Sequence, residues 1–135
     1  MRLVADIESD HFLEKMTKIH CIAALDADNP SKSWVFGPDK IDDAIDLLQS
    51  ADELIFHNGI TFDVPAIQKL YPNFSTDGLM LTDTLVLSRL IRADLLERDI
   101  KNSWADPESR YPKRLFGSHG LKAWGYRLGV LKGDF

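Results

Sequence analysis

The sequence predicts an α/β domain in which helices flank a mixed five-stranded sheet. Apolar runs of strand length recur at residues 2–8, 19–25, 33–36, 53–57 and 79–83. Between and after the later runs lie stretches whose apolar residues have helical spacing. The apolar fraction of 44% and the charged fraction of 27% are those of an ordinary globular protein. A length of 135 residues fits one compact domain, so we expect a single domain over residues 1–135.

The first predicted strand carries two acids near its end. Asp6 and Glu8 are two residues apart, so both carboxylates point to the same face of the strand. Phe12 and Leu13 follow where the strand pattern stops. They either pack in the core or wedge against the terminal bases of an entering single strand, since apolar side chains hold unpaired bases.

The second and third runs predict a hairpin. Between them lies Asp26–Ser31, which is dense in turn-forming residues. Together with the first strand, these runs form an antiparallel meander. Asp26 and Asp28 do not indicate a calcium loop, because the Gly and the terminal Glu of such a loop are missing.

A helix is expected after Gly37 and Pro38, with Asp39 as its N-cap. Its core-facing stripe has the i, i+3, i+4, i+7 spacing and consists of Ile41, Ala44, Ile45 and Leu48. The acids on the other face need no ligand, because a solvated face near the positive end of the helix accounts for them.

The fourth run, Glu53–His57, leads directly into a polar segment that ends at Asp63. We expect this strand to lie parallel to the first. Sites in α/β sheets gather beyond the carboxyl ends of strands, so Asn58 and Asp63 would then lie beside Asp6 and Glu8. Three carboxylates this close stay ionised at neutral pH only around a cation. Because all the ligands are oxygens, Mg²⁺ or Mn²⁺ fits better than Zn²⁺.

The residues around this segment have expected local roles. Gly59 allows a sharp turn, and Thr61 is the expected cap of a helix that begins near Phe62. His57, at a strand end, is interpreted as a hydrogen-bonded structural residue.

The rest of the chain is expected to hold a loop over 71–78, a fifth strand parallel to the first and a helix over 84–94. Residues 97–117 lack periodicity and are predicted to form a long loop. In it, Arg110, Tyr111 and Arg114 combine charge for phosphates with an aromatic ring for a base. The alternative is a solvated basic loop.

The last predicted helix begins with Ser118 as its cap and ends at Gly129. The side chains expected to face the core are Leu121, Trp124 and Leu128.

Charge and composition exclude several classes of protein. A net charge of -5 argues against a protein that coats nucleic acid non-specifically, although a nuclease with a local acidic site remains possible. The longest wholly apolar run, Cys21–Leu25, is far too short to span a membrane. Cys21 is the only cysteine, which fits a buried thiol in a cytoplasmic protein.

The ordered set of motifs resembles the DnaQ-like 3′–5′ exonucleases, a family named for its four acids, Asp-Glu-Asp-Asp. Asp6-x-Glu8 and Asn58-x-x-x-Phe62-Asp63 match the first two family motifs. Further segments resemble the amino-terminal proofreading domain of family A DNA polymerases from short-tailed phages: His57–Gly59, Phe62–Ala66, Asp83–Ile91, Phe116–His119 and Ala123–Gly129. The resemblance extends over nearly the whole chain.

The resemblance implies a ribonuclease H-like fold and a metal-dependent exonuclease that acts on the 3′ end of single-stranded DNA. It implies that Asp6, Glu8 and Asp63 are catalytic and bind Mg²⁺ or Mn²⁺, with two ions in the complete family site. Asn58 and Phe62 would hold the terminal nucleotide. Proofreading beside a polymerase domain or chain is implied in the same way.

Two further expectations come from comparison with the family. Asp83 lies at a strand–helix junction in the resembling enzymes, so we expect it to cap the helix that follows and not to bind metal. The third family motif, Tyr-x-x-x-Asp or His-x-x-x-x-Asp, does not occur before the chain ends at Gly133–Phe135. We therefore expect the C-terminal part of the domain to be missing, one well-held metal ion, and a slow or inactive isolated nuclease.

Two other functions stay open. The same chemistry could act on short RNA, since discrimination depends on contacts to the 2′-hydroxyl. The chain could also be a non-catalytic nucleic-acid-binding module whose acids form a structural cation site.

Overall fold

The computed structural model describes residues 1–131, so the predicted chain end at Gly133–Phe135 lies outside the described residues. The chain forms two compact units, Met1–Thr84 and Leu85–Phe135. The first unit contains all five strands, and the described part of the second unit is helical. One domain over residues 1–135 stays a prediction.

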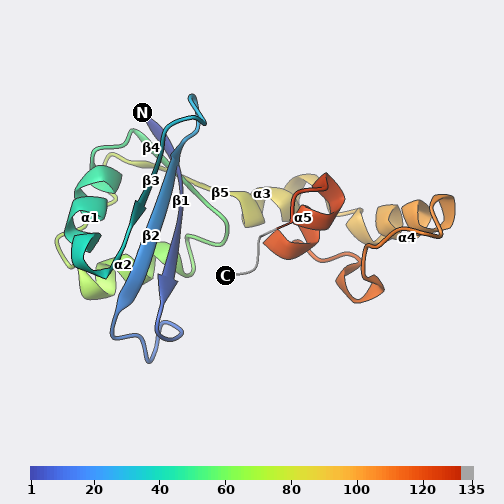
Figure 1. The fold of residues 1–135 in the computed structure, drawn as a ribbon, viewed down its shortest axis with the longest axis horizontal. Coiled ribbons are helices and arrows are strands. Elements are labelled where there is room, and N and C mark those ends of the chain that lie inside the picture. Colours follow the sequence, from blue (N-terminus) through green and yellow to red (C-terminus); the bar gives the residue numbers. More distant parts are fainter. Residues whose placement is uncertain (132–135) are drawn as a thin grey trace. The chain divides into compact units, whose positions relative to one another are not determined.

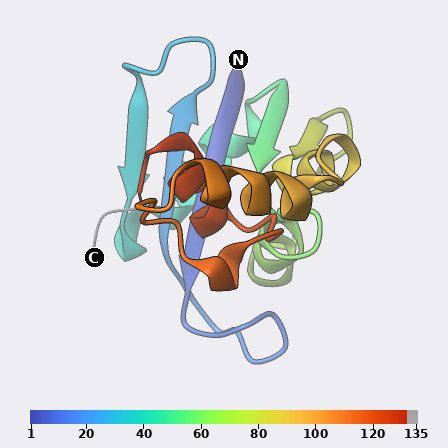
Figure 2. The same ribbon diagram turned by 90° about the vertical axis from the view of Figure 1, so that its right-hand side faces the viewer.

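The first unit is built on a five-stranded sheet in the order β3-β2-β1-β4-β5. Figures 1 and 2 show β1 in the middle of this sheet. β2 pairs antiparallel with β1 and β3, whereas β4 pairs parallel with β1 and β5. The predicted mixed sheet, a meander followed by two parallel strands, is confirmed. The strands are β1 (Arg2–Ser9), β2 (Ile19–Asp26), β3 (Ser33–Phe36), β4 (Glu53–Phe56) and β5 (Met80–Asp83).

Two helices, α1 (Ile41–Gln49) and α2 (Asp63–Leu70), lie on one side of the sheet (Figure 1). β1 alternates strictly, because its even-numbered residues up to Glu8 are exposed and its odd-numbered residues from Leu3 to Ile7 are buried. Only one face of the strand therefore enters the core. The predicted stripe of α1 packs into the same core, with Ile41, Ala44 and Leu48 fully buried and Ile45 partly buried.

Both predicted helix caps in this unit are wrong. Asp39 lies inside a short 3₁₀ turn, Pro38–Lys40, and α1 begins after it without a side-chain cap. The cap position of α2 is Phe62, also without a side-chain cap. The Thr61 hydroxyl donates instead to the side-chain oxygen of Asn58, which keeps it inside the preceding turn.

The second unit begins at the second residue of α3 and continues with α4, a 3₁₀ turn and α5. Their bounds are α3 (Thr84–Ile91), α4 (Leu95–Ala105), the turn Lys113–Leu115 and α5 (Leu121–Leu128). α4 occupies much of the predicted loop over 97–117, so that prediction was wrong. The buried positions of α4 are Leu95 and Asp99, four residues apart. An acid fills the second position, although Leu96, Ile100 and Trp104 still recur at helical spacing along α4.

The last helix differs from its prediction at its start and on its core face. α5 is preceded by Gly120 as its cap residue, and Ser118 Oγ accepts the Gly120 N–H at 3.2 Å. Leu121 and Leu128 are 57% and 69% exposed, and Ala123 is the residue that α5 buries. The predicted end is confirmed. The C-cap Gly129 has φ 70°, a left-handed conformation that suits glycine.

Among the described residues, no helix is both long enough and apolar enough to cross a membrane.

Candidate active site

Asp63, one of the predicted acids, reaches the edge of β1. Pairing between β1 and β4 ends at Val4 and Ile55, so the later part of β1 extends past β4. There the Asp63 Oδ1 accepts the backbone N–H of Ile7 at 3.3 Å. Ile7 lies between Asp6 and Glu8, so the Asp63 carboxylate reaches the strand at the point where both other acids originate.

Asp63 is an unusual first-turn residue, because it is only 4% exposed. Burial and the negative charge of Asp6 raise its pKa from 3.8 to about 6, although the hydrogen bond from Ile7 acts in the opposite direction. Asp6 is therefore close enough to Asp63 for the two charges to repel, and a cation beside them would relieve that repulsion.

The structure brings the three acids to one region without completing a metal cage. Asp6 and Glu8 lie on the exposed face of β1, and Asp63 is buried at its edge. Within residues 1–131, no three His, Cys, Asp or Glu side chains are arranged so that they could hold a metal ion as they stand. The assignment of Asp6, Glu8 and Asp63 as metal ligands stays a prediction.

Asp83 holds the turn that precedes Asp63. It is 5% exposed, and its two carboxylate oxygens accept the backbone N–H groups of Asn58 at 2.9 Å and Ile60 at 3.1 Å. Asn58 has φ 75°, a left-handed conformation that Asn tolerates better than most residues. The carboxylate fixes the loop that delivers Asn58, and the capping of α3 expected of Asp83 stays a prediction.

Gly59 in the same turn has no room for a side chain. A Cβ built on it would lie 2.3 Å from the Cβ of Phe56. Glycine is needed at this position because the backbone packs closely against Phe56, and not because of a left-handed φ.

His57 is a structural residue, as expected. The Thr84 hydroxyl donates to the Phe56 carbonyl oxygen at 3.1 Å, and the His57 Nδ1 lies 2.9 Å from that hydroxyl. These bonds fix the end of β4 to the start of α3.

An aromatic cavity of about 530 Å³ is formed by residues 11–15 and Phe62. Phe12 is 87% exposed, whereas Leu13 is partly buried against the core. Leu13 thus packs in the core, and contact of Phe12 with a base stays a prediction. Phe62 directly precedes Asp63, so one chain segment supplies the cavity wall and an acid.

Two side chains that sequence reasoning did not select hold the loop of this cavity. Asp10 accepts the backbone N–H groups of Thr17 at 3.0 Å and Lys18 at 3.1 Å. Lys69, at the far end of α2, donates to the carbonyl oxygens of Leu13 at 2.7 Å and Glu14 at 3.1 Å. Contacts to backbone oxygens across 55 or 56 residues leave no sequence pattern, so only the tertiary structure could reveal Lys69.

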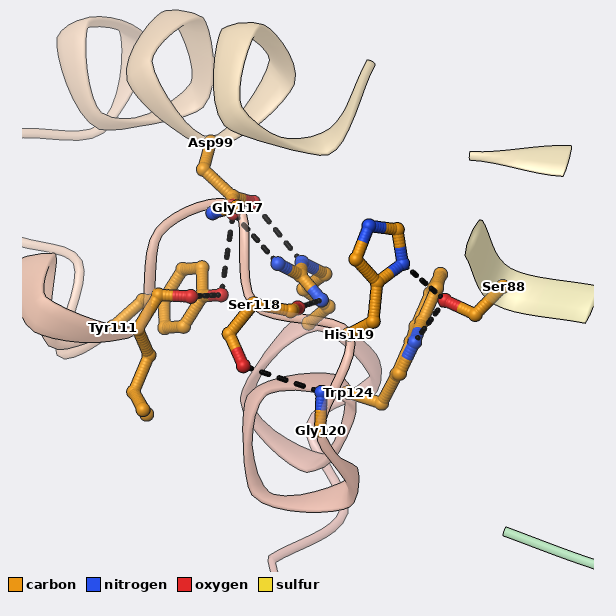
Figure 3. A network of polar contacts seen from close by, with 10 residues as sticks. Ser88, Asp99, Tyr111, Gly117, Ser118, His119, Gly120 and Trp124 are labelled. Carbon is orange, nitrogen blue, oxygen red and sulfur yellow. Dashed lines mark hydrogen bonds and ion pairs between the residues drawn. The ribbon is translucent and has the colours of Figure 1, made fainter. Parts of the chain in front are cut away.

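The predicted contribution of Tyr111 to substrate binding stays a prediction, and its contacts lie within the second unit. Its hydroxyl donates to Asp99 Oδ2 at 3.2 Å and to the Leu115 carbonyl at 2.9 Å (Figure 3). Its ring packs on Phe116 and Tyr126, with centroids 5.2 Å and 5.8 Å away. Both ends of the side chain are thus occupied inside the second unit.

Arg110 and Arg114 are exposed, so a role of these two arginines in holding phosphates stays a prediction.

Comparison with known proteins relates the chain to polymerases. No family model matches it. It is 38% identical to the DNA-directed DNA polymerase of Enterobacteria phage T3 and 36% identical to that of Escherichia phage T7, each over 142 residues. The chain is homologous to part of these phage polymerases. Each match covers 98% of the chain and 20% of the polymerase, so the chain spans about a fifth of the curated relatives it matches.

Comparison with solved structures identifies the fold. The chain matches E. coli ExoI, in a zinc-bound complex with single-stranded DNA, with a TM-score of 0.63 and 14% identity over 98% of this chain and 36% of ExoI. It also matches the family B DNA polymerase of Pyrobaculum calidifontis, with a TM-score of 0.52 and 15% identity over 93% of this chain and 21% of that polymerase. The expected ribonuclease H-like fold is confirmed, and so is the resemblance to phage polymerases.

Proposed function

We propose that this chain is a metal-dependent 3′–5′ exonuclease module that removes nucleotides from the 3′ end of single-stranded DNA. Its main support is the contact between Asp63 and the Ile7 N–H, which brings a buried carboxylate to β1 between two other acids. Homology to two phage DNA polymerases supports the same reaction, as does a fold shared with ExoI.

Asp6, Glu8 and Asp63 would hold a divalent ion, Mg²⁺ or Mn²⁺. Their chemistry fits, because all three offer carboxylate oxygens and because Asp6 and Asp63 repel each other without a cation. A bound ion supplies activation of the attacking water and stabilisation of the leaving oxygen. We expect one well-held ion at these three acids.

The substrate end would occupy the aromatic cavity beside these acids. Phe12 and Phe62 offer ring surface to an unpaired base, which contributes about 1–3 kcal/mol for each stacked base. Asn58 sits on a turn fixed by Asp83 and would orient the terminal nucleotide. We include proofreading beside a polymerase in the proposal, because both curated relatives are polymerases.

Digestion of 5′-labelled single-stranded DNA in Mn²⁺ tests the reaction. We expect a ladder that shortens from the 3′ end, slower cleavage of an RNA of the same sequence, and loss of the ladder in Asp6→Asn. Asp42→Asn is the matched control, because Asp42 is an exposed acid on α1, on the covered side of the sheet. Phe12→Ala should weaken binding of the DNA and leave the fold unchanged.

Three outcomes contradict parts of the proposal. Equal, background-level hydrolysis by the parent chain and Asp6→Asn, even with excess Mn²⁺, would leave only nucleic-acid binding. Faster digestion of RNA would exclude the DNA assignment. Internal cleavage products would exclude exonuclease action.

A further inference from the structure

We propose that the second unit, in its described residues 85–131, is itself a binding site for single-stranded nucleic acid, with a cavity beside α4 and α5 that takes phosphates and bases. This inference rests on the proposed exonuclease function, because it names a second place where the strand is held. It arises from charge distribution and from a cavity that the candidate active site does not use.

The two units carry opposite net charge. Residues 1–84 have 6 Lys and Arg against 15 Asp and Glu, a net charge of -9. Residues 85–135 have 10 Lys and Arg against 6 Asp and Glu, a net charge of +4. The overall value of -5 conceals this difference. A basic unit attached to an acidic metal-binding unit can attract a polyanion that the acidic unit repels.

A cavity of about 670 Å³ gives this charge a defined location. It lies entirely within the second unit, and its volume is in the range of small-ligand sites. Basic and aromatic side chains in its wall include Arg92, Arg98, Lys101, Trp124 and Tyr126. Basic groups for phosphates beside ring faces for bases are the combination by which proteins hold single strands.

The acids that line the cavity leave it weakly positive. Asp94 lies 3.3 Å from Arg98, and Asp99 lies 2.7 Å from Arg127, so these two carboxylates are paired. Glu97 is the remaining acidic group, against the two basic side chains of Arg92 and Lys101. The lining therefore has one more positive than negative charge.

Polar contacts hold the Trp124 side chain of the cavity wall in place (Figure 3). Arg127 donates two hydrogen bonds to Asp99 and one to the Ser118 carbonyl, and its guanidinium lies 5.0 Å from the centre of the Trp124 ring. The Trp124 indole N–H donates to Ser88 Oγ at 2.8 Å. Side chains fixed in this way lose less entropy when a strand binds.

Fluorescence anisotropy of a labelled oligothymidylate in EDTA tests the site without hydrolysis. Arg92→Ala with Lys101→Ala should weaken binding about tenfold. It should also lower the slope of log K against log salt by about 1.4, since each single-strand phosphate contact contributes about 0.7. Arg89→Ala with Lys122→Ala is the matched control. It removes the same charge from exposed positions of the same unit that do not line the cavity.

The control decides between a site and a diffuse effect. Equal weakening by both double variants would overturn the cavity and leave only the net charge of the unit. If the double variant does not fold, the single variant Lys101→Glu, at an exposed position, repeats the test. Unchanged affinity in all of them overturns the inference even if the chain hydrolyses DNA. If the cavity variant binds more weakly as expected but the parent chain shows no nuclease activity, only the exonuclease proposal is refuted.

Discussion

Replacing Asp63 by Asn should stabilise the metal-free protein and at the same time abolish its metal response. The ionised carboxylate is buried beside Asp6, and its pKa is raised from 3.8 to about 6. A shift of that size corresponds to a penalty of about 3 kcal/mol at neutral pH, because one unit is equivalent to 1.36 kcal/mol. Asn keeps an oxygen that can accept the Ile7 N–H, so the variant loses the charge and retains that contact.

The pH dependence has a definite sign. Between pH 3.8 and about 6, the folded state holds the Asp63 proton more tightly than the unfolded state, so stability falls as the pH rises through this range. Asp63→Asn should therefore match the parent near pH 4 and exceed it most above pH 6. Urea unfolding in EDTA at pH 4, 5, 6 and 7.5 measures the difference.

Added Mn²⁺ should reverse the order at pH 7.5, because only the parent gains stability from a bound ion. Asp83→Asn is the control for a buried acid in the same unit. Its carboxylate accepts two backbone N–H groups, which a single amide oxygen cannot both satisfy well, so we expect a loss of about 1–3 kcal/mol at every pH. An Asp63→Asn variant that is less stable than the parent at pH 7.5 without metal would refute the electrostatic reasoning.

Three further substitutions probe the loop, the turn and the second unit. Lys69→Met should raise KM for single-stranded DNA severalfold with little change in kcat, because the cavity loop loses its hydrogen bonds to α2. Lys69→Arg should bring KM part of the way back. An unchanged KM in Lys69→Met would exclude a positioning role. Gly59→Ala should destabilise the first unit by about 1–3 kcal/mol, since its Cβ would overlap Phe56; a neutral midpoint in urea unfolding would contradict this. Arg127→Met should destabilise the second unit by about 3–5 kcal/mol by leaving Asp99 buried without its cation; parent-like hydrogen exchange in this unit would disprove it.

Local patterns determined most of the first unit. Alternation in β1 placed Asp6 and Glu8 on one face, and the turn formers at residues 26–31 predicted the hairpin. The apolar spacing that begins at Ile41 predicted α1. These predictions succeed because strand and helix periodicity depends on neighbours in the sequence, where burial of one face imposes the pattern.

The second unit shows why pattern reasoning fails elsewhere. α4 was missed, and its buried face holds an acid, Asp99. Burial opposes ionisation of that carboxylate, but hydrogen bonds and charge from Arg127 still hold its pKa below the usual value. An acid that is stable in the interior only because of a residue 28 positions later cannot be recognised locally.

The sequence by itself determined which side chains can carry the chemistry, because Asp6, Glu8, Asn58 and Asp63 form an ordered motif within strand and turn patterns. Only the tertiary structure decided how these groups are held. The reach of Asp63 to the Ile7 N–H depends on where β4 stops along β1, and the cavity loop depends on the contacts made by Lys69. Such contacts join residues more than fifty positions apart, so their geometry follows from packing of the whole unit and not from any local preference.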